Sequence, residues 1–240
     1  MKKNIIYIQL YNYCFAPTLF PSLLTIILLP LLVYLGFWQI HRGDIKNHIQ
    51  KLFFQRSLSI PINLNQNKNI DLDKNYFPSK MQGHFDNKHT FLLENKIYLH
   101  KVGYEILTPF ILHTGQKAIL VNRGWITQGI DRKHIPNIPS FDKEINLHGL
   151  IIFPNKTFSF TQTNEKGWPK RIQSINPDFL KKNNFKSYIF IINTQSPYSF
   201  TPIWHPISLQ ASRHYAYACQ WFGLSITLLI VYFSTHIRRL

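Results

Sequence analysis

Two long apolar runs, one near each end of the chain, dominate the hydrophobic pattern. No Asp, Glu, Lys or Arg occurs in residues 4–41, and none occurs in residues 214–237. A helix needs about 20 largely apolar residues to cross roughly 30 Å of hydrocarbon, and each run is long enough. We therefore predict membrane-spanning helices at residues 18–40 and 214–234.

The charges that flank these runs predict which way the chain crosses the membrane. A pair of lysines precedes the first run and a pair of arginines follows the second. Short flanking segments rich in Lys and Arg stay in the cytoplasm. We expect cytoplasmic tails at residues 1–17 and 235–240, and residues 41–213 on the far side of the membrane. A cleavable signal peptide is the alternative for the first run, but that run is too long, and no small-x-small cleavage site follows it.

Between the two runs the pattern changes from helical to strand-like. Apolar positions at helical spacing carry the first helix on to about Arg56, and the polar stretch Asn63–Asn75 then reads as a loop. Asn176 and the proline after it are the N-cap and first position of a short helix that ends near Asn184. Short runs rich in Ile, Leu, Phe and Tyr predict strands at 89–94, 104–111, 117–122, 145–153 and 188–193.

The connections between these strands favour an antiparallel sheet. Residues 113–116 contain a glycine and separate two strand-like runs, which is typical of a hairpin. Helices that would join parallel strands are missing from the pattern. The predicted fold class is membrane α+β: two transmembrane helices flank a mainly antiparallel β-sheet domain with a few helices.

Charge and cysteine content limit the possible partners of this domain. The chain has 27 Lys and Arg against 11 Asp and Glu, and all but four of the basic residues lie in the region 42–213. A basic domain can face anionic lipid headgroups, an acidic partner or an anionic ligand, or it can reflect composition alone. The topology argues against nucleic acid. Cys14 and Cys219 lie in or beside the apolar runs, so no disulfide framework supports the domain.

The sequence lacks the common signatures of enzymes. We find no Gly-x-Ser-x-Gly elbow, no phosphate-binding glycine loop, no His-Glu-x-x-His and no evident pair of catalytic acids. Two Cys and two Met, widely separated, give poor support to copper handling. We predict a protein that is not an enzyme, and a two-span sensor or membrane-bound enzyme is the disfavoured alternative.

The most informative polar residue is His214, at the mouth of the second apolar run. An ionisable group in such a place is costly and is therefore a functional hypothesis. An imidazole beside aromatic walls and arginines suits a haem, with His214 as a ligand of the iron. The alternative is that His214 only anchors the helix at the interface, with tryptophans as belt residues. On a helix, the residues on or beside one face are His214, Tyr217, Ala218, Trp221 and Ser225.

Three further features carry candidate roles. Arg42 and Arg213 flank the predicted spans on the outer side and suit pairing with propionates. Cys219-x-x-x-Gly223 is a small-x-x-x-small pattern that lets another helix approach closely, and Gly36 offers the same on the first span.

In the domain, residues 121–126 form the strongest motif. We expect its strand to end at Asn122, Gly124 to permit a turn or close backbone approach, and Trp125 to pack with a polar edge. Arg123 pairs with a carboxylate or propionate, or forms a structural corner at the strand end; we favour the corner.

Three motifs occur in order along the chain: Gly36-x-Trp38-Gln39-x-x-Arg42, Val121-Asn122-Arg123-Gly124-Trp125 and Arg213-His214-x-x-Tyr217-Ala218-x-Gln220-Trp221-Phe222. On these motifs the chain resembles the Surfeit locus protein family, whose members are assembly factors for haem-copper cytochrome oxidase. Gly103-Tyr104, Thr108-Pro109 and His148-Gly149 add weaker support. One departure is Gly43-Asp44, where relatives usually keep a more helix-favouring stretch.

The resemblance implies a two-span inner-membrane protein, with its domain in the periplasm or the mitochondrial intermembrane space. The lack of a long Arg-rich, amphipathic leader favours a bacterial protein, and hence the bacterial inner membrane. It implies a part in maturing the catalytic subunit of cytochrome c oxidase, with haem a bound transiently, and haem a synthase as a further partner. His214 occupies the place of the histidine that is the proposed haem ligand in bacterial relatives. The alternative is a ligand-free scaffold that holds oxidase intermediates through its spans, with Gly223 at the contact.

Overall fold

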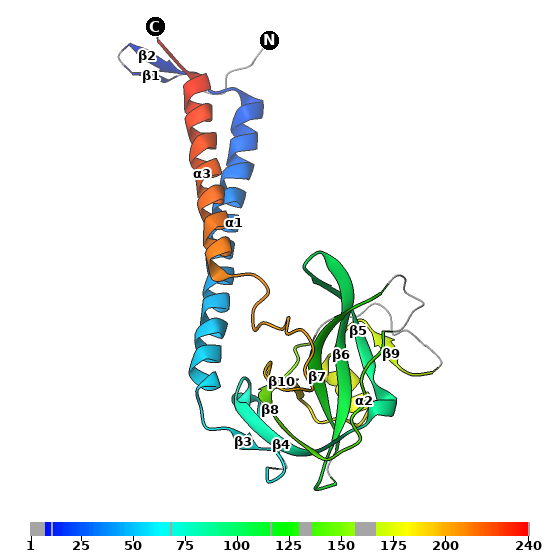
Figure 1. Ribbon diagram of the computed structural model, residues 1–240. Helices are drawn as coiled ribbons and strands as arrows, with labels where there is room; N and C mark the ends of the chain where they lie inside the picture. The colour runs from blue at the N-terminus through cyan, green and yellow to red at the C-terminus, as the bar shows by residue number, and fades with distance from the viewer. Residues whose placement is uncertain are drawn as a thin grey trace. The chain divides into compact units, whose positions relative to one another are not determined.

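The computed structural model describes residues 8–10, 12–67, 69–115, 117–129, 136–156 and 167–239, in two compact units (Figure 1). One unit comprises Met1–Lys51 and Pro206–Leu240, and the other comprises Leu52–His205. The first contains the two ends of the chain and its long helices, and the second contains the large sheet. The units are described one after the other.

Two long helices match those predicted from the apolar runs. Helix α1 spans Leu19–Ser57, and helix α3 spans Ala211–His236. Helix α1 continues past the apolar run as a single helix, as its spacing predicted, and Pro30 lies inside it without ending it. Both helices are long and apolar enough to cross a membrane.

The faces on which α1 and α3 meet are built from small and polar residues. Ser22 and Tyr232 bond across the pair through their hydroxyls at 2.8 Å. Spacings of three, four and seven residues place these side chains on one seam, as in a coiled coil. Small residues let the two backbones approach closely. The buried seam residues are Ser22, Thr25, Gly36 and Gly43 of α1, and Ala211, His214, Ala218, Ser225 and His236 of α3.

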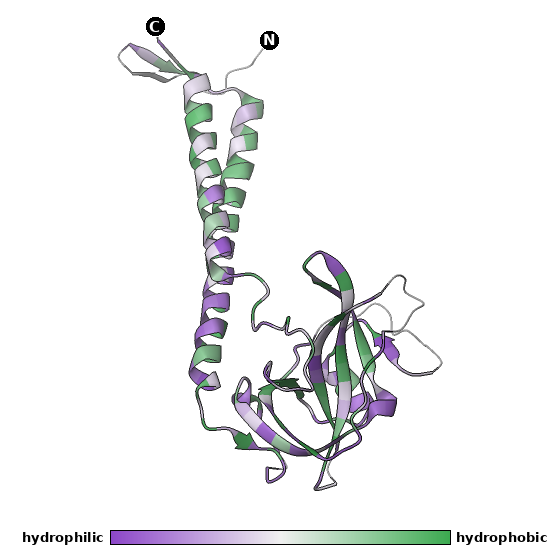
Figure 2. Ribbon diagram, viewed as in Figure 1, coloured by the Kyte–Doolittle hydropathy of each residue, from purple (hydrophilic) through white to green (hydrophobic). Residues whose placement is uncertain are grey.

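The opposite faces of both helices carry large exposed hydrophobic side chains. Figure 2 shows apolar colouring along α3 and the first part of α1, and polar colouring in the last turns of α1. A helix of a water-soluble domain usually turns such residues towards a core. These exposed side chains include Phe20, Ile26, Ile27, Leu31 and Phe37 of α1, and Leu224, Ile226, Ile230 and Val231 of α3.

A small sheet forms where the sequence predicted only tails. Strands β1 (Ile8–Leu10), β2 (Tyr13–Phe15) and β11 (Ile237–Arg239) pair antiparallel, with β2 in the centre. The amide of Ala16 also donates to the carbonyl of His236 at 2.9 Å. Each strand has three residues, too few for a hydrophobic alternation to show, and the pairing depends on the helices bringing the chain ends together.

The second unit contains one mixed sheet of eight strands. Its order is β3-β4-β8-β10-β7-β6-β5-β9, and β4 also pairs with β6. Because β4 bonds to both β8 and β6, the strands β4, β8, β10, β7 and β6 close into a barrel. Antiparallel pairings outnumber parallel ones, in agreement with the predicted fold class. The strands are β3 (Ile62–Asn63), β4 (Pro78–Phe85), β5 (Phe91–Tyr98), β6 (Lys101–Leu112), β7 (Ile119–Thr127), β8 (Ile145–Ile152), β9 (Lys170–Ile172) and β10 (Ile189–Ile192).

Short helices complete this unit. They are the 3-10 turns η1 (Leu72–Lys74) and η2 (Asn87–His89) and the helix α2 (Pro177–Lys182). The N-cap of α2 is confirmed, because the side-chain oxygen of Asn176 accepts from the amide of Phe179 at 2.8 Å. The predicted hairpin is also confirmed, because β6 and β7 pair antiparallel.

The barrel has an apolar interior that encloses the hydroxyl of Tyr188. Met81, Phe110, Val121 and Phe190 belong to a single buried cluster with Tyr188. The hydroxyl of Tyr188 is enclosed without a hydrogen-bond partner in the described part of the chain. Burial raises the pKa of Tyr188 to about 12, so the phenol stays neutral at physiological pH.

The strand predicted to end at Asn122 instead continues to Thr127, and this prediction was wrong. Glu105 pairs with Trp125 and Leu107 pairs with Asn122, so β7 has one residue more than β6 between these pairs. The extra residue makes a β-bulge, which bends a strand without ending it. Gly124 lies in the bulge with φ +103°, and its amide donates to the Asn122 side-chain oxygen at 2.9 Å.

We expect Gly124→Ala to destabilise the barrel by about 2–4 kcal/mol. A Cβ at this position would combine a left-handed φ with a contact of 2.8 Å to the carbonyl oxygen of Thr201. Gly129→Ala is the matched control, since Gly129 has φ +78° and nothing within 4 Å of its Cβ position. Chemical unfolding of the purified full chain should show a larger loss for Gly124→Ala. Equal losses would contradict a role for the close approach to Thr201.

Candidate functional site

His214 lies in the first turn of α3 and faces α1. Its Nδ1 is 2.8 Å from the Oε1 of Gln39, and the residue is only 7% exposed. Gln39 falls on the same seam of α1 as Gly36 and Gly43, at positions three and four residues from them. The seam therefore brings together a histidine and a glutamine that are 175 residues apart in sequence.

The second ring nitrogen of His214 is left without a partner. No described residue bonds to Nε2, and Nε2 is not among the enclosed side-chain atoms that lack a hydrogen bond. It therefore keeps access to its surroundings, although most of the ring is covered. A ligand reaching this nitrogen would meet an imidazole whose other side is already bonded.

This donor set suits one kind of metal better than others. In the described part of the chain, no group of three or more His, Cys, Asp and Glu side chains could hold a metal ion. A free ion needs several protein ligands, whereas the iron of a haem takes its equatorial ligands from the macrocycle and needs an axial one. A single imidazole with a free Nε2 fits the second case.

Two glycines of α1 receive aromatic rings of α3 on either side of this pair. A Cβ on Gly36 would lie 2.6 Å from the Phe222 ring, and a Cβ on Gly43 would lie 2.6 Å from the Tyr215 ring. We call these two positions the glycine seats. They hold the backbones close enough for Gln39 to reach His214.

The seat at Gly43 has a polar bond beside it. The hydroxyl of Tyr215 donates to the Oδ1 of Asp44 at 2.8 Å. In the sequence, Gly43-Asp44 stood out as a departure from the family pattern in a helix. The structure keeps the helix intact through both residues and gives each a contact on α3. Sequence reasoning missed Tyr215, although the seven-residue spacing of Gly36 and Gly43 was a usable signal.

The other residues predicted near His214 lie on more open faces. Arg42 and Arg213 are exposed, and the Arg42 guanidinium lies 5.9 Å from the centre of the Trp38 ring. Tyr217 and Trp38 are also exposed, and Trp221 is half-buried. On α3, spacings of four residues place Arg213, Tyr217 and Trp221 in one strip beside His214. Both arginines are therefore free to meet anionic groups of a ligand or lipid.

The small-x-x-x-small pattern of α3 lies on an exposed face of the helix. Cys219 and Gly223 are both exposed, and nothing lies within 4 Å of a Cβ position on Gly223. The face that carries this pattern is thus distinct from the seam that carries His214.

In the sheet unit, the motif at 121–125 forms an internal corner. Asn122 is buried and its amide donates to the Oε1 of Glu105 at 3.0 Å, while Lys96 pairs with the other carboxylate oxygen at 2.8 Å. The Trp125 indole donates to the carbonyl of Lys96 at 3.0 Å, which gives this ring its polar edge. The side chains around the bulge thereby satisfy one another.

The Arg123 side chain is buried in this corner and bonded within it. It is 1% exposed, and its guanidinium donates to the carbonyl oxygens of Tyr198 and Pro139 at 3.1 and 3.4 Å. Burial lowers the pKa of Arg123 to about 10, which still leaves the group charged at neutral pH. This geometry fits a structural role for Arg123, but at a bulge within β7 and not at the strand end that we predicted. The rings of Phe85, Phe141 and Phe200 surround the cation at 4.9, 5.2 and 4.8 Å from their centres.

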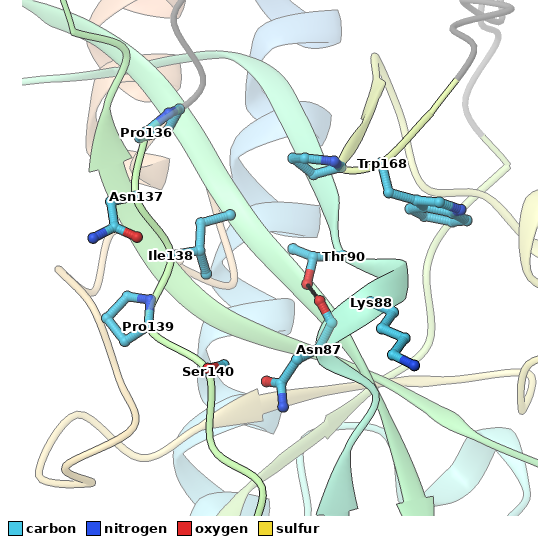
Figure 3. Close-up of a pocket in the computed structure, with 10 residues that line it drawn as sticks. Asn87, Lys88, Thr90, Pro136, Asn137, Ile138, Pro139, Ser140 and Trp168 are labelled. Atoms are coloured by element: carbon cyan, nitrogen blue, oxygen red, sulfur yellow. Dashed lines mark hydrogen bonds between the residues drawn. The ribbon is translucent and has the colours of Figure 1, made fainter.

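One hollow of the sheet unit, about 470 Å³ in volume, lies beside the turn η2 (Figure 3). In it the Thr90 hydroxyl donates to the carbonyl of Asn87 at 3.5 Å. Lys88 is the only ionisable side chain among its described lining residues. The described lining residues therefore contain no acid–base pair.

The sequence that contains the helix pair and the corner matches a known protein family. The sequence profile described as the SURF1 family matches residues 26–226, which includes Gln39, His214 and the bulge motif. The chain belongs to the SURF1 family. A SURF1-like protein of Rickettsia felis is 30% identical over 225 residues, covering 88% of this chain and 94% of the relative.

Further SURF1 relatives come from both bacteria and animals. A SURF1-like protein of Rickettsia bellii is 29% identical over 228 residues, covering 84% of this chain and 85% of the relative. Surfeit locus protein 1 of Gallus gallus is 26% identical over 239 residues, covering 90% of this chain and 75% of the relative. The similarity thus includes both apolar helices and the sheet unit.

We expect Gly36→Leu to loosen the helix pair at a cost of about 1–3 kcal/mol, because the new side chain must displace the Phe222 ring from its seat. Gly223→Leu is the matched control on the open face of α3 and should leave stability nearly unchanged. Thermal unfolding of the detergent-purified chain, followed by helical circular dichroism, measures both. A larger drop for Gly223→Leu would show that the seam is wrongly assigned.

Proposed function

We propose that this chain is a membrane-anchored assembly factor for haem-copper cytochrome c oxidase. In this proposal it binds haem a transiently at His214 and passes it to the catalytic subunit, and haem a synthase is the partner that supplies it. The observation that carries the proposal is the His214–Gln39 bond, which presents one imidazole with a free Nε2 between two apolar helices. Membership of the SURF1 family supports the oxidase as the destination.

We infer the location from the two apolar helices and from the charges near the chain ends. Large hydrophobic side chains on the outer faces of α1 and α3 are suited to lipid contact. The lysine and arginine pairs at the two ends favour cytoplasmic termini. The sheet unit then lies in the periplasm of a bacterium, and the two Rickettsia relatives support a bacterial inner membrane.

The task we infer is delivery of a cofactor and not a chemical reaction. A carrier must release what it binds, and one imidazole binds more weakly than a complete ligand set. Arg42 and Arg213 are the cations that would pair with the propionates, and Tyr217 and Trp221 would line the same side of α3. Exposed arginines bind through a solvated ion pair, which is weak enough to be reversed.

His214→Ala should remove the haem a absorption signal from the chain purified after co-expression with haem a synthesis. The substitution deletes the proposed axial ligand but leaves the glycine seats in place. His84→Ala, at an exposed histidine of the sheet unit, should keep the wild-type spectrum. Wild-type protein that carries no haem a under these conditions would count against the proposal, as would normal haem loading of the oxidase in a deletion strain.

A ligand-free scaffold is the second candidate, and the open face of α3 favours it. Cys219 and Gly223 leave space on which another apolar helix could pack closely. If capture of the oxidase subunit depends on this face, Gly223→Leu should reduce co-purification of that subunit several-fold while His214→Ala has little effect. The opposite ranking in the same pull-down experiment would exclude the scaffold as the main function.

A further inference from the structure

We infer that Gln39 is a positioning residue that holds His214 in its Nδ1–H tautomer, so that Nε2 is the ring nitrogen with a free lone pair. The inference rests on the proposed function for the identity of the ligand, but the tautomer itself is a property of the chain alone. Gln39 lies on α1 and does not need to touch the ligand to act. It would act through the ring that it bonds.

The orientation of the Gln39 amide decides which ring nitrogen carries the proton: in the structure its oxygen, and not its NH₂ group, faces Nδ1. The Oε1 atom of Gln39 has only lone pairs and must accept, so the Nδ1 of His214, 2.8 Å away, must donate. A neutral imidazole carries one ring proton, and the bond made by one nitrogen decides the state of the other. A proton on Nδ1 leaves Nε2 unprotonated, which is the form that ligates a metal.

The tautomer of His214 matters because the ring is buried in the seam between the two helices. Neutral histidine in water favours the opposite tautomer, with the proton on Nε2, and that proton would block a metal. His214 is 7% exposed and sits in a seam between apolar helices, where a hydrogen bond is stronger than in water. With the amide oxygen turned to the ring, an Nε2–H tautomer would set two acceptors against each other, so this orientation of Gln39 opposes the tautomer that histidine favours in water.

The glycine seats set the distance between the α1 and α3 backbones at which Gln39 can bond to His214. Gly36 receives Phe222 and Gly43 receives Tyr215, one on each side of Gln39 along α1. The hydroxyl of Tyr215 donates to Asp44, so that carboxylate already has a hydrogen-bond partner. Arg42 is exposed and lies against Trp38. Gln39 is the group bonded to the ring in the described structure, and a partner bonded in this way typically changes metal affinity about 10–100-fold.

The test is nitrogen NMR of the full chain in detergent, labelled with ¹⁵N-histidine, at a pH where the imidazole is neutral. His214→Ala identifies the signals of His214 by their loss. The wild type should show a protonated Nδ1 and an unprotonated Nε2. Gln39→Leu should shift the ring to the Nε2–H form, and Gln39→Glu, which keeps an acceptor, should retain Nδ1–H.

Gln220→Leu is the matched control, because Gln220 is an exposed glutamine of α3. It should leave the His214 signals unchanged. A wild-type ring protonated on Nε2 would overturn the inference, since the Gln39 amide would then present its NH₂ group to Nδ1. An unchanged tautomer in Gln39→Leu would overturn it as well. The wild-type spectrum decides the matter even if Gln39→Leu does not fold.

Titration with haem a separates this inference from the proposed function. Both hold if wild type and Gln39→Glu bind and Gln39→Leu binds about 10–100-fold more weakly. A wild-type chain with the Nδ1–H tautomer that binds no haem a sustains the inference and sinks the proposed function. Haem a binding through His214 with equal affinity in Gln39→Leu sustains the proposed function and sinks the inference.

Discussion

The close approach of two helices on the glycine seats is the constraint on which the helix unit depends. Gly36 and Gly43 have no side chains to separate the backbones, so the Phe222 and Tyr215 rings fill the space instead. Only at that separation can the Gln39 amide reach the His214 ring. A polar pair between apolar helices is tolerated because its two members satisfy each other, and that mutual satisfaction also orients the imidazole.

In the sheet unit, the polar groups around the β7 bulge also form hydrogen bonds with nearby groups of the chain. One extra residue in β7 interrupts the ladder, and Asn122 satisfies the displaced amide of Gly124 with its own side chain. Arg123 then points into three aromatic rings and two carbonyl groups, where its charge is balanced by dipoles and ring faces. The motif at residues 121–125 therefore has a structural explanation: its side chains bond the groups that the β7 bulge leaves outside the regular ladder.

Sequence patterns predicted the elements with strong periodicity and missed those that depend on distant partners. Both long helices, the cap at Asn176 and the β6–β7 hairpin follow from local signals. Strand β4 was missed because its inward positions include Ser79 and Gly83, so the apolar alternation is weak. Barrel closure, the β7 bulge and the terminal sheet all require pairing between segments far apart, which no local pattern records. At the candidate site, His214 and Gln39 were separate predictions, and only the helix seam shows that they form one unit.

The two faces of α3 bear differently on the two candidate functions. His214, Ala218 and Ser225 face the seam, whereas Cys219 and Gly223 face outward with open space beside them. A carrier needs the first face and a scaffold needs the second, so one helix could serve both without competition between its residues.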